Sequence, residues 1–579
     1  MNEDNNFLKD NNTQDNKKTC RNPLKMMLAN KNTFCIKAIL FIALGMLIFS
    51  IIVLSSVPPT AKDELVHHLA VPKLYLEHGG IYEIPFMEYA YYPMNLDLLY
   101  MIPLYFGNDI VPKFIHFAFA LLTAWLIFYY LKRRVDWMYA LFGAVFFLSI
   151  PIIIKLSITA YIDLGEIFFS FAALVLILEW MRSDFRLKYL IWAGIMCGLA
   201  LGTKYNGLVT LVILALFVPF AYAGHHVKKT SWFVCPLCYG IIFLLISLIV
   251  FSPWMIRNYQ WKGNPIYPFY NSVFNPPKGV EKSVHSQIQT VQKNSGFLTE
   301  RAVRYKETGL QIALLPVRIF FQGRDGDPQY YDGKLNPFLL ILPFFAFYRL
   351  KNEPEYLKRE KRMLLAFSIL FFSFAFFTSG LRIRYISPFI PPLTVLSVLG
   401  LSNLFKMAGQ LSSLIVRKAC LAMVIVLPCL AVALNAGYIM GQFKSVDPVP
   451  FITGKISRDE YIGKYVPEYP AVSYINNNLD VRAKILFIYT GNRGYYCNRE
   501  YTTDAGILEG SIRKAETQYD ILKELKRQNI THLLIGYRLF EEWMNNNFSD
   551  EERTLTQAFF NGHLELLYGE NGFGVSVIK

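Results

Sequence analysis

Long apolar stretches recur along the first three quarters of the chain, and short basic or Pro/Gly-containing breaks separate them. A helix needs about 20 consecutive apolar residues to cross a bilayer, and windows near this length are the dominant pattern. The two windows that flank Lys204 are short. The pattern predicts about eleven transmembrane helices, at residues 36–57, 110–131, 137–154, 164–181, 189–203, 206–223, 232–253, 335–350, 363–379, 385–405 and 418–438.

Basic residues gather in every second loop between these windows. Short loops rich in Lys and Arg stay in the cytoplasm, so the alternation sets the orientation of the spans. The polar residues 1–35 join this side and are expected to be disordered. An odd number of spans then places residues after 440 outside. The clusters are Lys132–Arg134, Arg182–Lys188, Lys228–Lys229, Arg349–Arg362 and Lys406–Lys418.

The chain divides into a membrane module at 36–440 and a soluble domain at 441–579. Two long external segments, 58–109 and 254–334, interrupt the module. In the soluble domain, apparent strands at 484–489, 532–536 and 574–578 accompany a helical stretch at 511–528, which indicates a small α/β domain. We expect this domain to be accessory to any chemistry.

The composition agrees with a polytopic α-helical membrane protein, with 54% hydrophobic and 17% charged residues. The net charge of +15 is spread over the loops as a topology signal, and not gathered on one soluble face. Nucleic acid is therefore excluded as a partner. Cys235-x-x-Cys238 has no second pair and opens a predicted span, so we interpret both cysteines as small helix residues.

Ionisable residues near the membrane edge all fall on the external side. Such residues are costly unless they are paired or used, so their common side predicts one polar cavity. Its arginines can hold a phosphate, while a carboxylate takes the proton of an incoming nucleophile. The residues are Asp63, Glu64, Asp163, Lys204, Arg257, Arg382 and Arg384.

Each of these residues also has a structural interpretation. Asp63 and Glu64 can cap a surface helix at 63–78 that ends at Gly79-Gly80, and Asp163 can cap the fourth span. Arg382 and Arg384 can extend toward the interface, and Arg257 can brace the second external segment.

Histidines near the acidic pair raise the possibility of a metal site. His67 and His68 are adjacent, and neighbouring helical side chains point about 100° apart, so they should not chelate one ion together. We predict no metal ligands and no cofactor, with a divalent ion left open.

Several motifs along residues 36–405 resemble those of bacterial GT-C glycosyltransferases. More narrowly, they are similar to the protein O-mannosyltransferase and lipid A aminoarabinose transferase superfamily, which is glycosyltransferase family 39 in the broad sense. The motifs are Asp63-Glu64-x-x-x-His68-x-x-x-Pro72, Tyr92-Pro93, Ala160-Tyr161-Ile162-Asp163, Gly202-Thr203-Lys204-Tyr205-Asn206-Gly207, Ser252-Pro253-Trp254-x-x-Arg257-Asn258, Gly263-Asn264-Pro265 and Arg384-Tyr385.

The resemblance implies transfer of a sugar from a polyprenyl-phosphate donor to a lipid, glycan or protein acceptor. The reaction is expected at the outer face of the bacterial cytoplasmic membrane, with Asp63 as general base and Glu64 as the alternative. The expected substrate-binding residues are His68, Tyr92, Asp163, Lys204, Arg257, Arg382, Arg384 and Tyr385.

Two other functions stay open. A transporter or flippase of lipid-linked glycans needs no chemistry, although such proteins more often show internal repeats, which this chain does not. An O-antigen ligase or polymerase type enzyme also uses lipid-linked sugars, but it would lack the acidic pair after the first span.

Overall fold

Most of the chain is helical. The computed structural model describes residues 23–224, 234–276, 297–348, 353–374 and 380–579. Twelve helices occupy the predicted windows: α1 Pro23–Ser55, α4 Val111–Lys132, α5 Trp137–Ser149, α6 Pro151–Ser157, α7 Asp163–Arg182, α8 Leu187–Thr203, α9 Gly207–Ala223, α10 Val234–Lys262, α16 Phe338–Ala346, α17 Glu355–Phe374, α19 Ile390–Gly409 and α20 Leu414–Val446.

Not all of these helices can cross a membrane alone. Among the helices that the structure describes, six are long and apolar enough to span, or seven if the pair α5 and α6, bent by 66°, is one span. α8 and α9 have 17 residues each, and α16 has nine. The predicted number of eleven spans therefore stays a prediction. Most of residues 1–35, Lys228–Lys229 and the ends of the windows at 350 and 379 lie outside the described residues.

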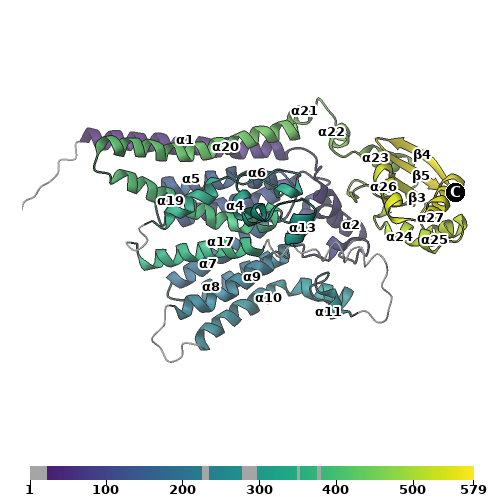
Figure 1. Ribbon diagram of the computed structural model, residues 1–579, viewed down its shortest axis with the longest axis horizontal. Helices are drawn as coiled ribbons and strands as arrows, with labels where there is room; N and C mark the ends of the chain where they lie inside the picture. Colours follow the sequence, from purple (N-terminus) through teal and green to yellow (C-terminus); the bar gives the residue numbers. More distant parts are fainter. Residues whose placement is uncertain (1–22, 225–233, 277–296, 349–352, 375–379) are drawn as a thin grey trace, which may run out of the picture.

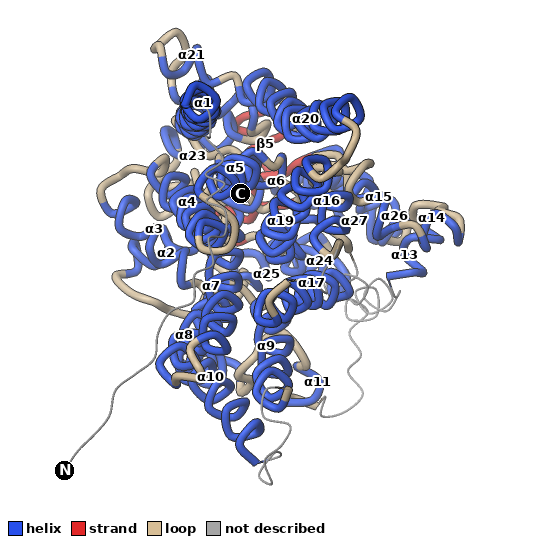
Figure 2. Tube along the Cα trace, turned by 90° about the vertical axis from the view of Figure 1, so that its left-hand side faces the viewer, coloured by secondary structure: helices blue, strands red, loops and turns tan. Residues whose placement is uncertain are grey.

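The long helices run side by side along one axis (Figure 1). Viewed along that axis, α1 and α20 lie at one edge of the bundle and α8, α9 and α10 at the opposite edge (Figure 2). Small residues allow close approach between neighbours: a Cβ atom on Gly198 of α8 would lie 2.6 Å from the Ser247 carbonyl oxygen of α10. Such packing of small residues is typical of membrane helices.

The first external segment contains more regular structure than its sequence predicts. The expected helix at 63–78 is divided into a π-helical turn, η1 Glu64–His68, and a helix, α2 Ala70–His78. Gly79 ends α2 with a φ of 82°, a left-handed conformation that favours glycine. The segment continues through η2 Glu88–Tyr91 and α3 Asn95–Tyr105.

The second external segment begins later than expected, because α10 continues to Lys262 and carries Arg257 on a helix. Short helices follow: α11 Asn271–Phe274, α13 Phe297–Val303, α14 Gly309–Ala313, α15 Leu315–Arg318 and the 3₁₀ turn η3 Pro328–Tyr330. The segment leads through α16 and α17 to α18 Ile383–Ile386 and the 3₁₀ turn η6 Ser387–Phe389.

The C-terminal residues form a sheet with the order β2-β1-β3-β5-β4, in which β1 is parallel to β2 and β3, whereas β5 is antiparallel to its neighbours. β1, β3 and β5 coincide with the expected strands; β2 and β4 were not expected. The expected helix at 511–528 is two helices. The strands are β1 Lys484–Ile488, β2 Glu500–Thr502, β3 His532–Gly536, β4 Leu564–Glu570 and β5 Phe573–Ile578.

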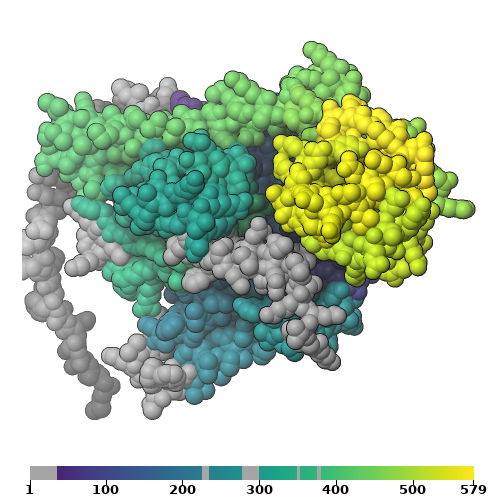
Figure 3. Space-filling model, turned by 45° about the vertical axis from the view of Figure 1, so that its right-hand side comes forward, coloured from purple at the N-terminus to yellow at the C-terminus, as the bar shows by residue number. Residues whose placement is uncertain are grey.

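Seven helices accompany these strands, and the domain lies at one end of the bundle, where Figure 3 shows it as a separate lobe. They are α21 Pro448–Ile452, α22 Arg458–Tyr465, α23 Tyr469–Asn478, α24 Gly506–Lys514, α25 Gln518–Arg527, α26 Tyr537–Asn547 and α27 Asp550–His563.

Candidate active site

An ion pair joins two of the predicted site residues across 321 positions of sequence. An Nη atom of Arg384, on α18, donates to a carboxylate oxygen of Asp63 at 2.6 Å. Asp63 directly precedes η1, and the Arg384 side chain is 11% exposed. Burial alone would raise the pKa of Asp63, but the charge of Arg384 beside it holds this pKa well below its usual range. Asp63 is therefore a carboxylate.

A second ion pair lies beside the first. The Lys204 ammonium, at the end of α8, donates to the Asp163 carboxylate, in the first turn of α7, at 2.6 Å. The Tyr385 ring contacts both cations: its centroid lies 5.0 Å from Lys204 Nζ and 5.1 Å from the Arg384 guanidinium carbon. Four of the seven residues that were predicted to share one cavity, Asp63, Asp163, Lys204 and Arg384, thus lie together.

The π-helical turn changes the geometry of the two histidines. The rings of His67 and His68 lie with their centroids 4.0 Å apart, so the argument that they point apart as in an α-helix is wrong. A π-helix has a wider turn than an α-helix, and such turns occur often at functional sites. His67 also stacks on Tyr89, at 4.5 Å between centroids.

His68 has a carboxylate partner that the sequence analysis did not identify. Its Nδ1 atom lies 2.7 Å from an oxygen of Asp97, on α3, and both side chains are buried. Burial lowers the pKa of His68 to about 4 and raises the pKa of Asp97 to about 7. One signal was available, since Asp97 is the single charged residue within 95–105.

Glu64 faces a different environment from Asp63. Its two carboxylate oxygens accept backbone N–H groups of Ala61 at 2.9 Å and Ala160 at 2.6 Å, and the side chain is buried. Burial also raises the pKa of Glu64. Its contacts join the turn that carries Asp63 to the link between α6 and α7, so its visible role is to shape that turn.

Arg257 lies between aromatic rings and braces the first external segment. Its guanidinium carbon lies 4.5 Å from the Trp254 ring centroid and 4.8 Å from that of Trp261, and it donates to the Tyr92 carbonyl at 3.1 Å. The Tyr92 ring packs on Tyr205. The structure thus places Arg257 against the first external segment, and not against the second one as the sequence suggested.

Arg382 lies in a neighbouring cluster and not on Asp63. Its guanidinium is 3.6 Å from the Asp332 carboxylate, which also accepts the Lys155 ammonium at 2.9 Å. The Arg382 side chain is 36% exposed, in contrast to Arg384. The two arginines therefore do not hold one group together as a bidentate pair in this arrangement.

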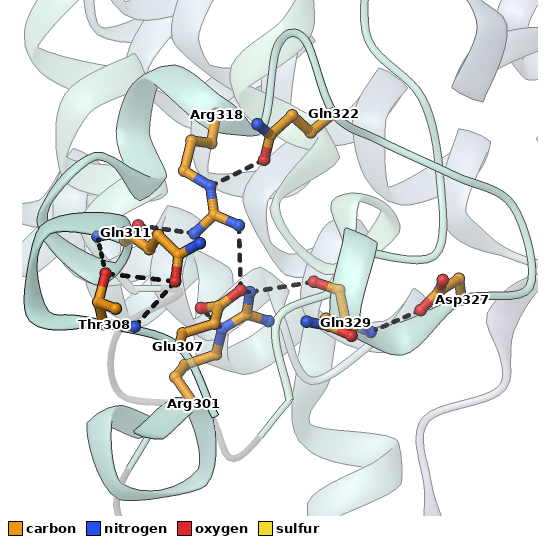
Figure 4. A network of polar contacts seen from close by, with 8 residues as sticks. All are labelled: Arg301, Glu307, Thr308, Gln311, Arg318, Gln322, Asp327 and Gln329. Carbon is orange, nitrogen blue, oxygen red and sulfur yellow. Dashed lines mark hydrogen bonds and ion pairs between the residues drawn. The ribbon is translucent and has the colours of Figure 1, made fainter. Parts of the chain in front are cut away.

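The second external segment fixes the position of α18, the short helix that carries Arg384. Arg301 donates two hydrogen bonds to Glu307, at 2.8 and 2.6 Å, and one to the Gln329 carbonyl at 3.0 Å (Figure 4). The turn around Gln329 then presents the Tyr331 carbonyl, which accepts the Ile383 N–H at 2.9 Å. Because Ile383 precedes Arg384, this network fixes the backbone from which the guanidinium extends.

Metal ligands are not gathered at the site. Within the described residues, no group of three or more His, Cys, Asp or Glu side chains has a geometry that could hold a metal ion. The chemistry that the arrangement can perform is proton abstraction by Asp63 and stabilisation of an anion by Arg384 and Lys204.

Comparison with known proteins identifies the fold. The family model described as dolichyl-phosphate-mannose-protein mannosyltransferase matches residues 101–256, a range that includes Asp163 and Lys204 but ends before Arg257. No curated protein sequence matches the chain.

Solved structures of ArnT and of an oligosaccharyltransferase match nearly the whole chain. ArnT from Cupriavidus metallidurans in the apo state matches with a TM-score of 0.54 and 12% identity, covering 95% of this chain and 98% of that one. ArnT bound to undecaprenyl phosphate matches equally well, with 13% identity. The apo oligosaccharyltransferase of Archaeoglobus fulgidus has a TM-score of 0.52 and 13% identity, covering 93% of this chain and 74% of that one.

The chain thus has the fold of ArnT and of the archaeal oligosaccharyltransferase, which is the fold that the resemblance of the motifs implied. The family-model match and the likeness to ArnT and to the archaeal oligosaccharyltransferase confirm that resemblance.

Glu64→Gln provides a test of the shaping role of this residue. The amide keeps the volume but has only one acceptor oxygen, so either the Ala61 or the Ala160 N–H loses its partner. An unsatisfied buried donor costs about 1–3 kcal/mol. We expect a lower thermal midpoint of the purified protein and faster hydrogen exchange in residues 59–69. An unchanged midpoint with unchanged exchange would show that these hydrogen bonds are dispensable.

Proposed function

We propose that this protein transfers a sugar from a polyprenyl-phosphate donor to an acceptor at the outer face of the cytoplasmic membrane of a bacterium. The observation that carries the proposal is the Asp63–Arg384 ion pair beside the Asp163–Lys204 pair, where the C-terminal domain contacts the chain around Asp63. A base and two cations in one place are what the displacement of a phosphate requires.

A lipid-linked phosphate is the donor class that suits this site. The cations lie at the end of apolar helices, so a donor with an isoprenoid tail can keep the tail in the bilayer and its phosphate at Arg384 and Lys204. The structural neighbour ArnT binds undecaprenyl phosphate, which supports the same class. The sequence also lacks the Walker A motif of nucleotide-binding proteins.

The proposed reaction is a single displacement. An acceptor hydroxyl oxygen attacks the anomeric carbon of the sugar, and the bond from that carbon to the phosphate oxygen breaks. The phosphate leaves with the bonding electrons and is stabilised by Arg384 and Lys204, while Asp63 takes the acceptor proton. Attack opposite to the leaving group inverts the anomeric configuration.

The ion pair also couples donor binding to the strength of the base. A donor phosphate competes with Asp63 for the Arg384 guanidinium. Once Arg384 turns to the phosphate, burial of Asp63 is less opposed and its pKa rises. Asp63 thus becomes a stronger base when the donor is bound.

We propose that Arg384 and Lys204 supply the positive charge that stabilises the leaving phosphate, a role that a divalent ion can also fill in enzymes. No metal ion then takes part in the reaction. Transfer that EDTA abolishes and Mg²⁺ or Mn²⁺ restores would overturn this assignment. We also propose that the C-terminal domain lies outside, since α7 begins with Asp163 at the site and ends with the basic residue Arg182 at its other end.

Asp63→Asn is the direct test of the base. The amide keeps shape and hydrogen bonding but cannot accept the proton, and general base catalysis contributes about 10²- to 10⁴-fold. We expect kcat to fall by this factor, measured as sugar transfer from a radiolabelled polyprenyl-phosphate donor, with donor binding retained.

The matched control is Asp184→Asn, an exposed aspartate in the loop between α7 and α8. Its transfer rate should equal that of the wild type. If Asp63→Asn leaves the glycan output of cells unchanged, a transporter without chemistry becomes the better interpretation.

Arg384→Gln tests the phosphate assignment. Loss of a charge-assisted hydrogen bond costs about 1.5–3 kcal/mol, which corresponds to donor affinity about 10- to 150-fold weaker. In the wild type, Arg384 holds the pKa of Asp63 low, so the acid limb of kcat/KM should lie below the usual carboxylate range. Without Arg384, burial is less opposed, so the pKa of Asp63 rises and the limb should move to higher pH.

Arg324→Gln is the control for charge alone, since Arg324 is exposed and stacks on Tyr330 in the second external segment. It should change neither donor affinity nor the acid limb. A normal donor affinity in Arg384→Gln would exclude Arg384 as the phosphate ligand.

A further inference from the structure

The C-terminal domain contacts the chain on both sides of Asp63. The Tyr496 hydroxyl donates to the Pro59 carbonyl at 2.7 Å, and the Tyr495 N–H donates to the Leu65 carbonyl at 3.1 Å. Both tyrosines belong to the loop that connects β1 with β2, residues 489–499, which is named the β1–β2 loop below. One hydrogen bond thus precedes Asp63 and the other follows it within the π-helical turn.

Lys73 makes the third and largest connection. Its ammonium, on α2, donates to the carbonyls of Tyr495 at 2.8 Å and Cys497 at 2.7 Å and to the side chain of Asn498 at 2.9 Å. A lysine ammonium has three donors, so the β1–β2 loop satisfies all of them. Because α2 directly follows η1, Lys73 ties the end of the Asp63 turn to the domain.

The β1–β2 loop is itself held firmly within its domain. Arg493 donates to both carboxylate oxygens of the buried Glu468, and the Asn476 side chain bonds the backbone of residues 496 and 498 at 2.8 Å each. The β1–β2 loop that contacts η1 is therefore itself fixed by hydrogen bonds within the C-terminal domain.

Apolar packing accompanies these polar contacts. Leu65, within η1, is fully buried against Ile462 and Val466 of the C-terminal domain. On the other side of the turn, Glu64 bonds the Ala160 N–H of the membrane module. The π-helical turn is thus held between the membrane module, which carries Asp163, and the C-terminal domain.

We infer that the C-terminal domain positions the general base: through Lys73, Tyr495 and Tyr496 it holds the π-helical turn so that Asp63 meets Arg384. The inference rests on the proposed function, in which Asp63 is the base. It assigns Lys73 and Tyr496 as positioning residues that never touch substrate, and it replaces the accessory role expected from the sequence. Misplacement of a reacting group by about 1 Å can cost about 10²-fold in rate.

The experiment compares Lys73→Met and Tyr496→Phe in the full chain, reconstituted in nanodiscs. Both variants approximately keep the side-chain volume; Tyr496→Phe removes one hydroxyl, whereas Lys73→Met removes the ammonium and with it the ion pair to Glu77. We expect kcat to fall by about 10- to 100-fold for Lys73→Met and by less for Tyr496→Phe, while KM for the donor stays within about twofold because Arg384 and Lys204 are untouched. Hydrogen exchange in residues 59–69 should become faster in both.

Matched controls come from the same domain. Lys484→Met removes a lysine that pairs with Glu500 on the exposed strand edge, and Tyr469→Phe removes a hydroxyl that bonds Asp459. Both should keep wild-type kcat and wild-type exchange in residues 59–69.

Two results would overturn the inference: unchanged exchange in residues 59–69 of Lys73→Met, or faster exchange with unchanged kcat. If Lys73→Met does not fold, Tyr496→Phe decides, since it loses a single hydroxyl group. Failure of the proposed function would look different, because the wild type would then transfer no sugar while the exchange measurement still reported whether the domain holds the turn.

Discussion

The candidate active site depends on one partly buried ion pair, Asp63 with Arg384. Removing two charges from water costs several kcal/mol for each ion, and their attraction offsets this only when both are held in good geometry. The 2.6 Å contact therefore requires that two segments 321 positions apart be fixed independently. The apolar helices do this in general, since they set the end of the bundle at which both segments emerge. Local hydrogen bonds around each segment then set the exact positions of the two side chains.

Those hydrogen bonds are of two kinds. Arg384 is held from the second external segment, where the buried Arg301–Glu307 pair sets the turn whose Tyr331 carbonyl bonds Ile383. Asp63 is held by Glu64 from the membrane module and by the β1–β2 loop from the C-terminal domain. A carboxylate and a guanidinium supported by separate bodies can part when a phosphate competes for the guanidinium. Such an exchange would link donor binding to the basicity of Asp63 without movement of the helices.

The π-helical turn η1, a departure from regular α-helix, lies directly after Asp63. A strict α-helix over 63–78 would send the side chains of His67 and His68 in different directions, whereas the π-helical turn brings their rings to 4.0 Å and places His68 on Asp97. Sequence periodicity does not distinguish a π turn from an α turn, because one additional residue per turn is too small a signal over five residues. For this reason the sequence predicted a role for His68 but neither its partner nor its orientation, and Glu64 remained an alternative base to Asp63.

The hydropathy of the sequence alone predicted a helical membrane protein, because repeated apolar windows of about 20 residues have the length that a helix needs to cross a bilayer. The alternation of basic loops and the type of each charged residue also placed Asp63, Asp163, Lys204 and Arg384 at one end, since charge is costly elsewhere in a bilayer. Only the tertiary structure decided which of these charges meet, because pairing depends on helix packing and on loops whose shape no local pattern encodes. It separated Arg382 from Arg384, gave Arg257 a bracing position between two tryptophans, and brought a distant α/β domain onto the turn of Asp63.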